Sequence, residues 1–163
     1  MSWLLERLRK YKDDRGMMAN LRCILVDNKK HRAWPALNRL GVALKDDVST
    51  FVSGLFATHP ETSDAGNFGN TCKAIEQQRG DKRSDDSKLT PTERRFQHLL
   101  AAERGDELQS RVLGMVLMAK AQGVPVNYEQ LETDLKFWGE RTKTEWASAF
   151  WTVGLPPVIK EGT

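Results

Sequence analysis

Apolar residues recur along this chain at intervals of three and four, the spacing that places side chains on one face of a helix. The clearest case fills the template i, i+3, i+4, i+7, i+8 with Val48, Phe51, Val52, Leu55 and Phe56, which predicts a buried helix. Similar but shorter patterns continue from residue 3 to residue 150, and the alternation typical of strands is almost absent. We therefore predict an all-α protein of about seven or eight helices.

Residues that cap helices stand between these apolar patterns. Asp14 precedes one predicted helix as its N-cap. Residues 90–93, Thr-Pro-Thr-Glu, combine an N-cap, a proline at the first helical position and a glutamate at the third, which together form a capping box. Thr142 and Glu145 have the same spacing ahead of an apolar run. We expect a helix to begin at each of these places.

A polar segment divides the chain into two parts. Residues 79–88 read RGDKRSDDSK and contain no apolar side chain, so this stretch cannot contribute to a hydrophobic core. The organisation we expect has four parts: a basic N-terminal helical lobe at 1–78, a polar linker at 79–89, a C-terminal helical lobe at 90–154 and a tail at 155–163.

Composition is that of a globular protein outside the membrane. The 163 residues are 39% hydrophobic, and no run approaches the roughly 18 apolar residues of a membrane helix. Glu6 and Arg7 place charges too early for a secretory signal, and two cysteines, Cys23 and Cys72, cannot build a disulfide framework. We expect a cytoplasmic protein with no membrane partner.

The sequence offers no catalytic or metal site. Its three histidines and two cysteines lack the close pairs that zinc sites use, and its acidic pairs stand beside helix starts or in the linker. The glycines of residues 66–70 come without the lysine and hydroxyl residue of a nucleotide loop, so a turn into a helix is the better interpretation. We expect a protein that is not an enzyme and needs no metal or cofactor.

Charge is distributed unevenly, although the formal net charge is only +3. Residues 1–45 hold 11 of the 25 Lys and Arg but 4 of the 22 Asp and Glu, a balance of +7, which leaves −4 for the remainder. Arg15 and Arg22 are two helical turns apart and fall along the same edge of a predicted helix, and residues 29–32 form a basic loop. One interpretation is a surface that attracts polyanions, because binding releases their counterions. The plainer interpretation is a solvated helix face.

Arginine predominates among these cations, which suits bidentate contact with phosphate. No motif that reads a base sequence is visible, so any nucleic-acid binding is expected to occur through the backbone. The candidate nucleic-acid-binding residues are Arg15, Arg22, Lys29, Lys30, Arg32, Arg94, Arg95, Arg104, Arg111, Arg141 and Lys143. For any one of them, an ion-paired or solvated side chain is the alternative.

An ordered series of short motifs resembles the CasB family, the small subunit of the type I-E CRISPR Cascade complex. In the C-terminal half these are Arg94-Arg95-Phe96, Leu99-Leu100, Arg104, Gly123-Val124-Pro125-Val126 and Trp138. In the N-terminal half they are Trp3, Asp14-Arg15-Gly16, Leu21-Arg22, Ala33-Trp34-Pro35, Leu55-Phe56-Ala57 and His59-Pro60.

This resemblance implies a non-enzymatic, two-lobed helical protein that is present in two copies within a crRNA-guided complex. It implies contacts with the Cascade backbone subunits, with the large subunit and with the DNA strands of the R-loop. Our main hypothesis is a subunit that stabilises the R-loop in antiviral defence. The competing hypothesis is a helical adaptor whose basic face binds an acidic protein.

Overall fold

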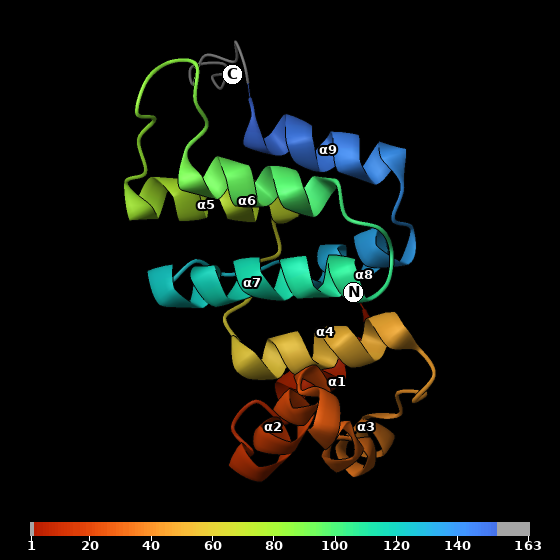
Figure 1. Cartoon of the computed structure of the whole chain (residues 1–163). Coiled ribbons are helices and arrows are strands. Elements are labelled where there is room, and N and C mark those ends of the chain that lie inside the picture. Colours follow the sequence, from red (N-terminus) through yellow and green to blue (C-terminus); the bar gives the residue numbers. More distant parts are fainter. Residues whose placement is uncertain (1, 153–163) are drawn as a thin grey trace.

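The computed structural model describes residues 2–152, and this part of the chain forms nine α-helices and two 3₁₀ helices (Figure 1). In chain order they are α1 (Trp3–Lys10), α2 (Arg15–Arg22), η1 (Cys23–Leu25), η2 (Asp27–Arg32), α3 (Trp34–Leu40), α4 (Asp47–Thr58), α5 (Phe68–Arg79), α6 (Pro91–Leu100), α7 (Asp106–Gln122), α8 (Tyr128–Lys136) and α9 (Glu140–Phe150). The prediction of an all-α protein is confirmed. The predicted tail lies outside the described residues.

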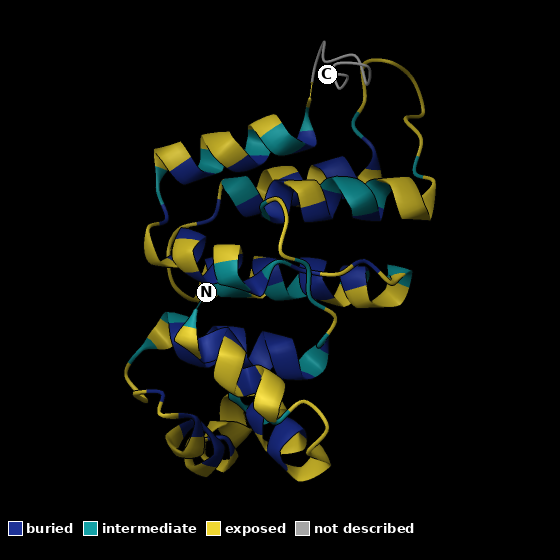
Figure 2. Ribbon diagram, turned by 180° about the vertical axis from the view of Figure 1, so that it is seen from behind, coloured by how far each residue is buried: buried dark blue, intermediate teal, exposed yellow. Residues whose placement is uncertain are grey.

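The helices stack in layers (Figure 1). At one end α5 packs against α6 and α9, and its other side meets α7. At the other end α4 packs against α1 and α2 and also contacts α7 and α8. Buried residues lie mainly where the helices of these layers face one another, and exposed residues lie mainly on the outward-facing parts of the ribbon (Figure 2). One hydrophobic core runs through the layers, from Leu4 in α1 to Phe150 in α9.

Helix α4 is the buried helix that the apolar spacing predicts. Nine of its twelve residues are buried, and Val52, Leu55 and Phe56 are fully inaccessible to solvent. Three polar residues are buried with them, and each has a partner. Thr50 Oγ1 donates to the Asp47 carbonyl at 3.0 Å, and Ser53 Oγ donates to the Ser49 carbonyl at 2.8 Å. Ser49 Oγ donates to an Asp46 carboxylate oxygen at 2.8 Å. Satisfied hydroxyls allow this helix to be covered on both sides without the cost of an unpaired polar group.

Two of the expected helix starts are confirmed. The Asp14 side chain accepts the amide of Met17 at 3.0 Å. The Thr90 hydroxyl accepts the amide of Glu93 at 3.0 Å, and the Glu93 carboxylate accepts the amide of Thr90 at 2.8 Å, which completes the capping box. Each such cap stabilises its helix by about 1 kcal/mol.

The capping box expected at Thr142 is wrong. Helix α9 begins two residues earlier, at Glu140, and the Thr142 hydroxyl donates to the Phe137 carbonyl at 3.0 Å instead of accepting an amide. The predicted basic loop at residues 29–32 is also wrong, because these residues belong to the 3₁₀ helix η2. No side chain of η2 is buried, so the apolar spacing carried no signal of it.

Helices α5 and α9 approach each other at Gly69. A β-carbon at this position would lie 2.0 Å from the carbonyl oxygen of Trp146, a distance that no side chain tolerates. Asn67 and Asn70 form a capping box at the start of α5. The Asn67 side chain accepts the amides of Gly69 and Asn70, and the Asn70 side chain accepts the amide of Asn67. The interpretation of residues 66–70 as a turn into a helix is confirmed.

The polar segment expected to be a linker joins α5 to α6, which contact each other. Asp81 accepts the amide of Thr92 at 3.1 Å. Arg83 donates two hydrogen bonds, of 3.1 and 2.8 Å, to the carboxylate of Glu93, whose side chain is 2% exposed. Hydrogen bonds therefore hold this segment against the N-terminus of α6, in place of apolar packing. The division of the chain into two lobes that fold separately stays a prediction.

Glu93 also accepts the indole N–H of Trp151 at 2.7 Å. These donors, Arg83 foremost, lower the pKa of Glu93 from 4.5 to about 2. A carboxyl whose pKa is lowered by folding stabilises the protein above its unfolded pKa and loses that contribution as the pH falls through the folded pKa.

We predict that the free energy of unfolding falls by up to about 3 kcal/mol between pH 4.5 and pH 2 through this group. In Glu93→Gln this component should be absent, and the protein should already be less stable at neutral pH. Urea unfolding across this pH range measures it, with the exposed Asp64→Asn as the control. An unchanged acid dependence in Glu93→Gln would contradict the assignment.

Candidate nucleic-acid interface

Five of the predicted residues lie on α2 and η2, at the α1–α3 end of the molecule. Arg15, Lys29 and Arg32 are exposed and form no ion pair with any other described residue. Lys30 lies 3.9 Å from Asp27, a carboxylate that is itself fully exposed. The positive charge of η2 therefore remains largely uncompensated within the described part of the protein.

The local sequence explains why these cations face outward. Leu25, before η2, is half-buried, and Ala33, after it, is fully buried, while no side chain in between is buried. The 3₁₀ helix is thus anchored at its two ends by apolar residues and carries its polar residues on the surface. Because η2 packs on η1 and α3, the three cations share one short, fixed element.

Arg22 differs from its predicted companion Arg15. Its guanidinium donates to the carbonyl of Ala57 at 3.0 Å, in the last turn of α4. Arginine at this place satisfies a carbonyl that the helix itself leaves without a partner. Arg22 therefore fastens α2 to α4, whereas the Arg15 side chain is exposed at the start of α2. The two arginines do not form a row of equivalent side chains.

The remaining candidates lie on other elements. Arg94 and Arg95 are exposed on α6, and Arg111 is exposed on α7. On α9, Arg141 lies 3.6 Å from Glu145, and Lys143 lies 5.7 Å from the centre of the Trp138 ring. Helices α6 and α9 are at the opposite end of the molecule from α2 and α3 (Figure 1). The structure does not bring the eleven predicted residues together in one surface.

Arg104 is a structural residue in this arrangement. It donates to the carbonyl of Lys136 at 3.2 Å and to the carbonyl of Trp138 at 3.0 Å. The Trp138 indole donates in return to the Ala102 carbonyl at 3.2 Å. These bonds tie the α6–α7 loop to the α8–α9 turn, and the guanidinium is occupied by protein carbonyls.

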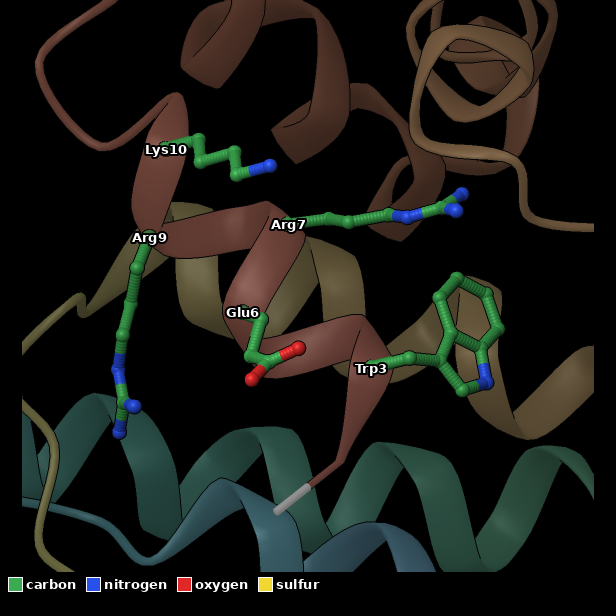
Figure 3. Close-up of a pocket in the computed structure, with 5 residues that line it drawn as sticks. All are labelled: Trp3, Glu6, Arg7, Arg9 and Lys10. Atoms are coloured by element: carbon green, nitrogen blue, oxygen red, sulfur yellow. The ribbon is translucent and has the colours of Figure 1, made fainter.

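A second group of cations lies on α1, within the basic N-terminal third, and is not among the eleven candidate residues. Arg7, Arg9 and Lys10 line an open groove together with Trp3 and Glu6 (Figure 3). The Arg7 guanidinium lies 5.0 Å from the centre of the Trp3 ring and also donates to the Leu40 carbonyl at 2.7 Å. The four-residue spacing of Trp3 and Arg7 on one helix is the signal that could have found this pair.

The chemistry of the described part adds no second kind of site. Within residues 2–152, no three side chains of His, Cys, Asp or Glu come together in a way that could hold a metal ion. Burial raises the pKa of the Cys72 thiol, which suits a core residue rather than a nucleophile. No described helix is long and apolar enough to cross a membrane.

Comparison with known proteins identifies the class of this helical, basic chain. Residues 7–151 match the family model of the CRISPR-associated protein Cse2. The protein is thus CRISPR-associated. It belongs to the Cse2 family, whose members are also called CasB, and is a component of a Cascade-type CRISPR system. The resemblance to CasB drawn from the sequence is confirmed.

Solved structures support the same fold. A Cse2-family protein from Thermus thermophilus has a TM-score of 0.72 and 17% identity, over 92% of this chain and 96% of its own. CasB from Thermobifida fusca has a TM-score of 0.66 and 16% identity, over 92% and 98%. CasB from M. ruber has a TM-score of 0.63 and 20% identity, over 97% and 96%. No curated protein matches the sequence significantly.

We predict that Arg104→Ala lowers the free energy of unfolding by about 1 to 2 kcal/mol, because two backbone carbonyls lose a charged donor. The matched control is Arg111→Ala, which removes an exposed arginine and should change stability by less than about 0.5 kcal/mol. Urea denaturation measures both. Equal free energies of unfolding for the two variants would contradict the structural role of Arg104.

Proposed function

We propose that this protein is the non-catalytic small subunit of a crRNA-guided Cascade complex and that it stabilises the R-loop through phosphate contacts. Membership of the Cse2 family supports the setting. The observation that carries the nucleic-acid role is the uncompensated charge of η2, where Lys29, Lys30 and Arg32 are exposed on one anchored element.

The physical task fits a surface of this kind. In a guided complex, base pairing with the guide supplies sequence specificity, and the heteroduplex is about as stable as the DNA duplex it replaces. A modest, sequence-independent attraction for the opened strands then shifts the balance towards the R-loop. Exposed lysine and arginine supply such an attraction by releasing counterions from phosphate. Nothing in this task requires a bond to be broken.

Protein partners are part of the same proposal. The CasB resemblance points to the backbone subunits, the large subunit and a second copy of this chain. Phe137 supports protein contact, because it is 73% exposed on the turn between α8 and α9. Exposed aromatic rings of this size are typical of interface cores.

To test the phosphate contacts, we predict the effect of changing Lys29, Lys30 and Arg32 together to Gln. Binding of single-stranded DNA should weaken, and the slope of log affinity against log salt should fall by about 2, since each contact contributes roughly 0.7. Fluorescence anisotropy over a salt series measures both quantities. The matched control changes three other exposed lysines, Lys45, Lys88 and Lys120, to Gln and removes the same charge.

Two outcomes would contradict this assignment. Equal losses of slope in both variants would mean that total charge matters and η2 does not. Absence of binding at low salt, by the chain alone and within its complex, would remove the nucleic-acid role and favour an acidic protein as the partner of the basic face.

A further inference from the structure

Trp34 is the first residue of α3 and takes no part in the hydrophobic core. Its side chain is 47% exposed, whereas α3 buries Ala36, Leu37 and Leu40. Trp138 and Trp146, by contrast, are buried, and their indole N–H groups have hydrogen-bond acceptors. The packing of α3 therefore does not explain a large aromatic ring at position 34.

The surroundings of the ring are aromatic and basic. The His31 ring lies against Trp34, with centroids 6.4 Å apart and planes 75° from parallel. His31 belongs to η2, so the exposed Lys29, Lys30 and Arg32 are its neighbours on an element that contacts α3. A ring held in orientation by a second ring, beside uncompensated cations, is the composition of sites that bind single-stranded nucleic acid.

We propose that Trp34 is a stacking platform for an unpaired nucleobase in a strand whose phosphates contact η2. The inference rests on the proposed function and adds the structural state of the ligand. Every base has a π-face, so stacking tolerates any sequence, and a base already stacked within a duplex is not available to the ring. The phosphate contacts attract any nucleic acid, and Trp34 selects the single strand.

Trp3 provides a natural comparison within the same half of the molecule. It is exposed to a similar extent, 45%, but the guanidinium of Arg7 already lies over its ring, at 5.0 Å from the centre. Figure 3 shows both side chains extending to the same side of α1. A face covered in this way is not open to a base, so Trp3 serves as the control tryptophan.

The test compares the full chain with its Trp34→Leu, Trp34→Phe and Trp3→Leu variants on two ligands. One is oligothymidylate, and the other is an abasic strand of equal length, which has the phosphates without the bases. The wild type should bind oligothymidylate about fivefold or more tightly than the abasic strand. Trp34→Leu should abolish this preference while the salt slope stays unchanged, Trp34→Phe should retain part of it, and Trp3→Leu should keep it.

Equal binding of the two strands by the wild type would overturn the platform and leave the phosphate contacts standing. The platform would also be overturned if Trp34→Leu kept the preference for oligothymidylate, or if Trp3→Leu lost that preference to the same extent as Trp34→Leu. Absence of binding to either strand would instead overturn the proposed function, and the platform with it. Circular dichroism of each variant tests whether the fold is intact. We expect an unchanged spectrum, because Trp3 and Trp34 are both about half exposed.

Discussion

Burial of α4 on two sides is the constraint on which the arrangement of the other helices depends. Nine of its twelve residues are buried, and it contacts α1 and α2 on one side and α7 and α8 on the other. Arg22 adds a hydrogen bond from α2 to the Ala57 carbonyl of this helix. The basic end is thereby packed onto the rest of the protein. Cations on a packed scaffold keep a fixed spacing, which contact with an ordered phosphate backbone requires.

The cations of this protein divide according to what their side chains contact. Arg22 and Arg104 donate to main-chain carbonyls, and Arg83 neutralises the buried carboxylate of Glu93. Lys29 and Arg32 have no such partner among the described residues. The first group stabilises the fold and the second is available to a ligand. A patch of basic sequence is therefore a weaker guide to binding than the partner of each cation.

Much of the fold could be predicted from the sequence, because local rules determine it. The spacing of Val52, Leu55 and Phe56 predicts α4, and residues 90–93 fix the start of α6. The role of Arg104 could not be predicted, since its acceptors are 32 and 34 residues away along the chain. Helix η2 could not be predicted, because none of its side chains is buried and its sequence therefore has no periodic apolar positions.

The central claim, that this subunit stabilises the R-loop through η2, is tested most directly by the lifetime of the R-loop in the assembled complex. The measurement is the rate at which the displaced strand reanneals, with the wild-type subunit and with Lys29, Lys30 and Arg32 changed to Gln. We predict faster reannealing with the variant, most clearly at low salt, where phosphate contacts contribute most. An R-loop lifetime that is unchanged, with the subunit still incorporated, would contradict the claim.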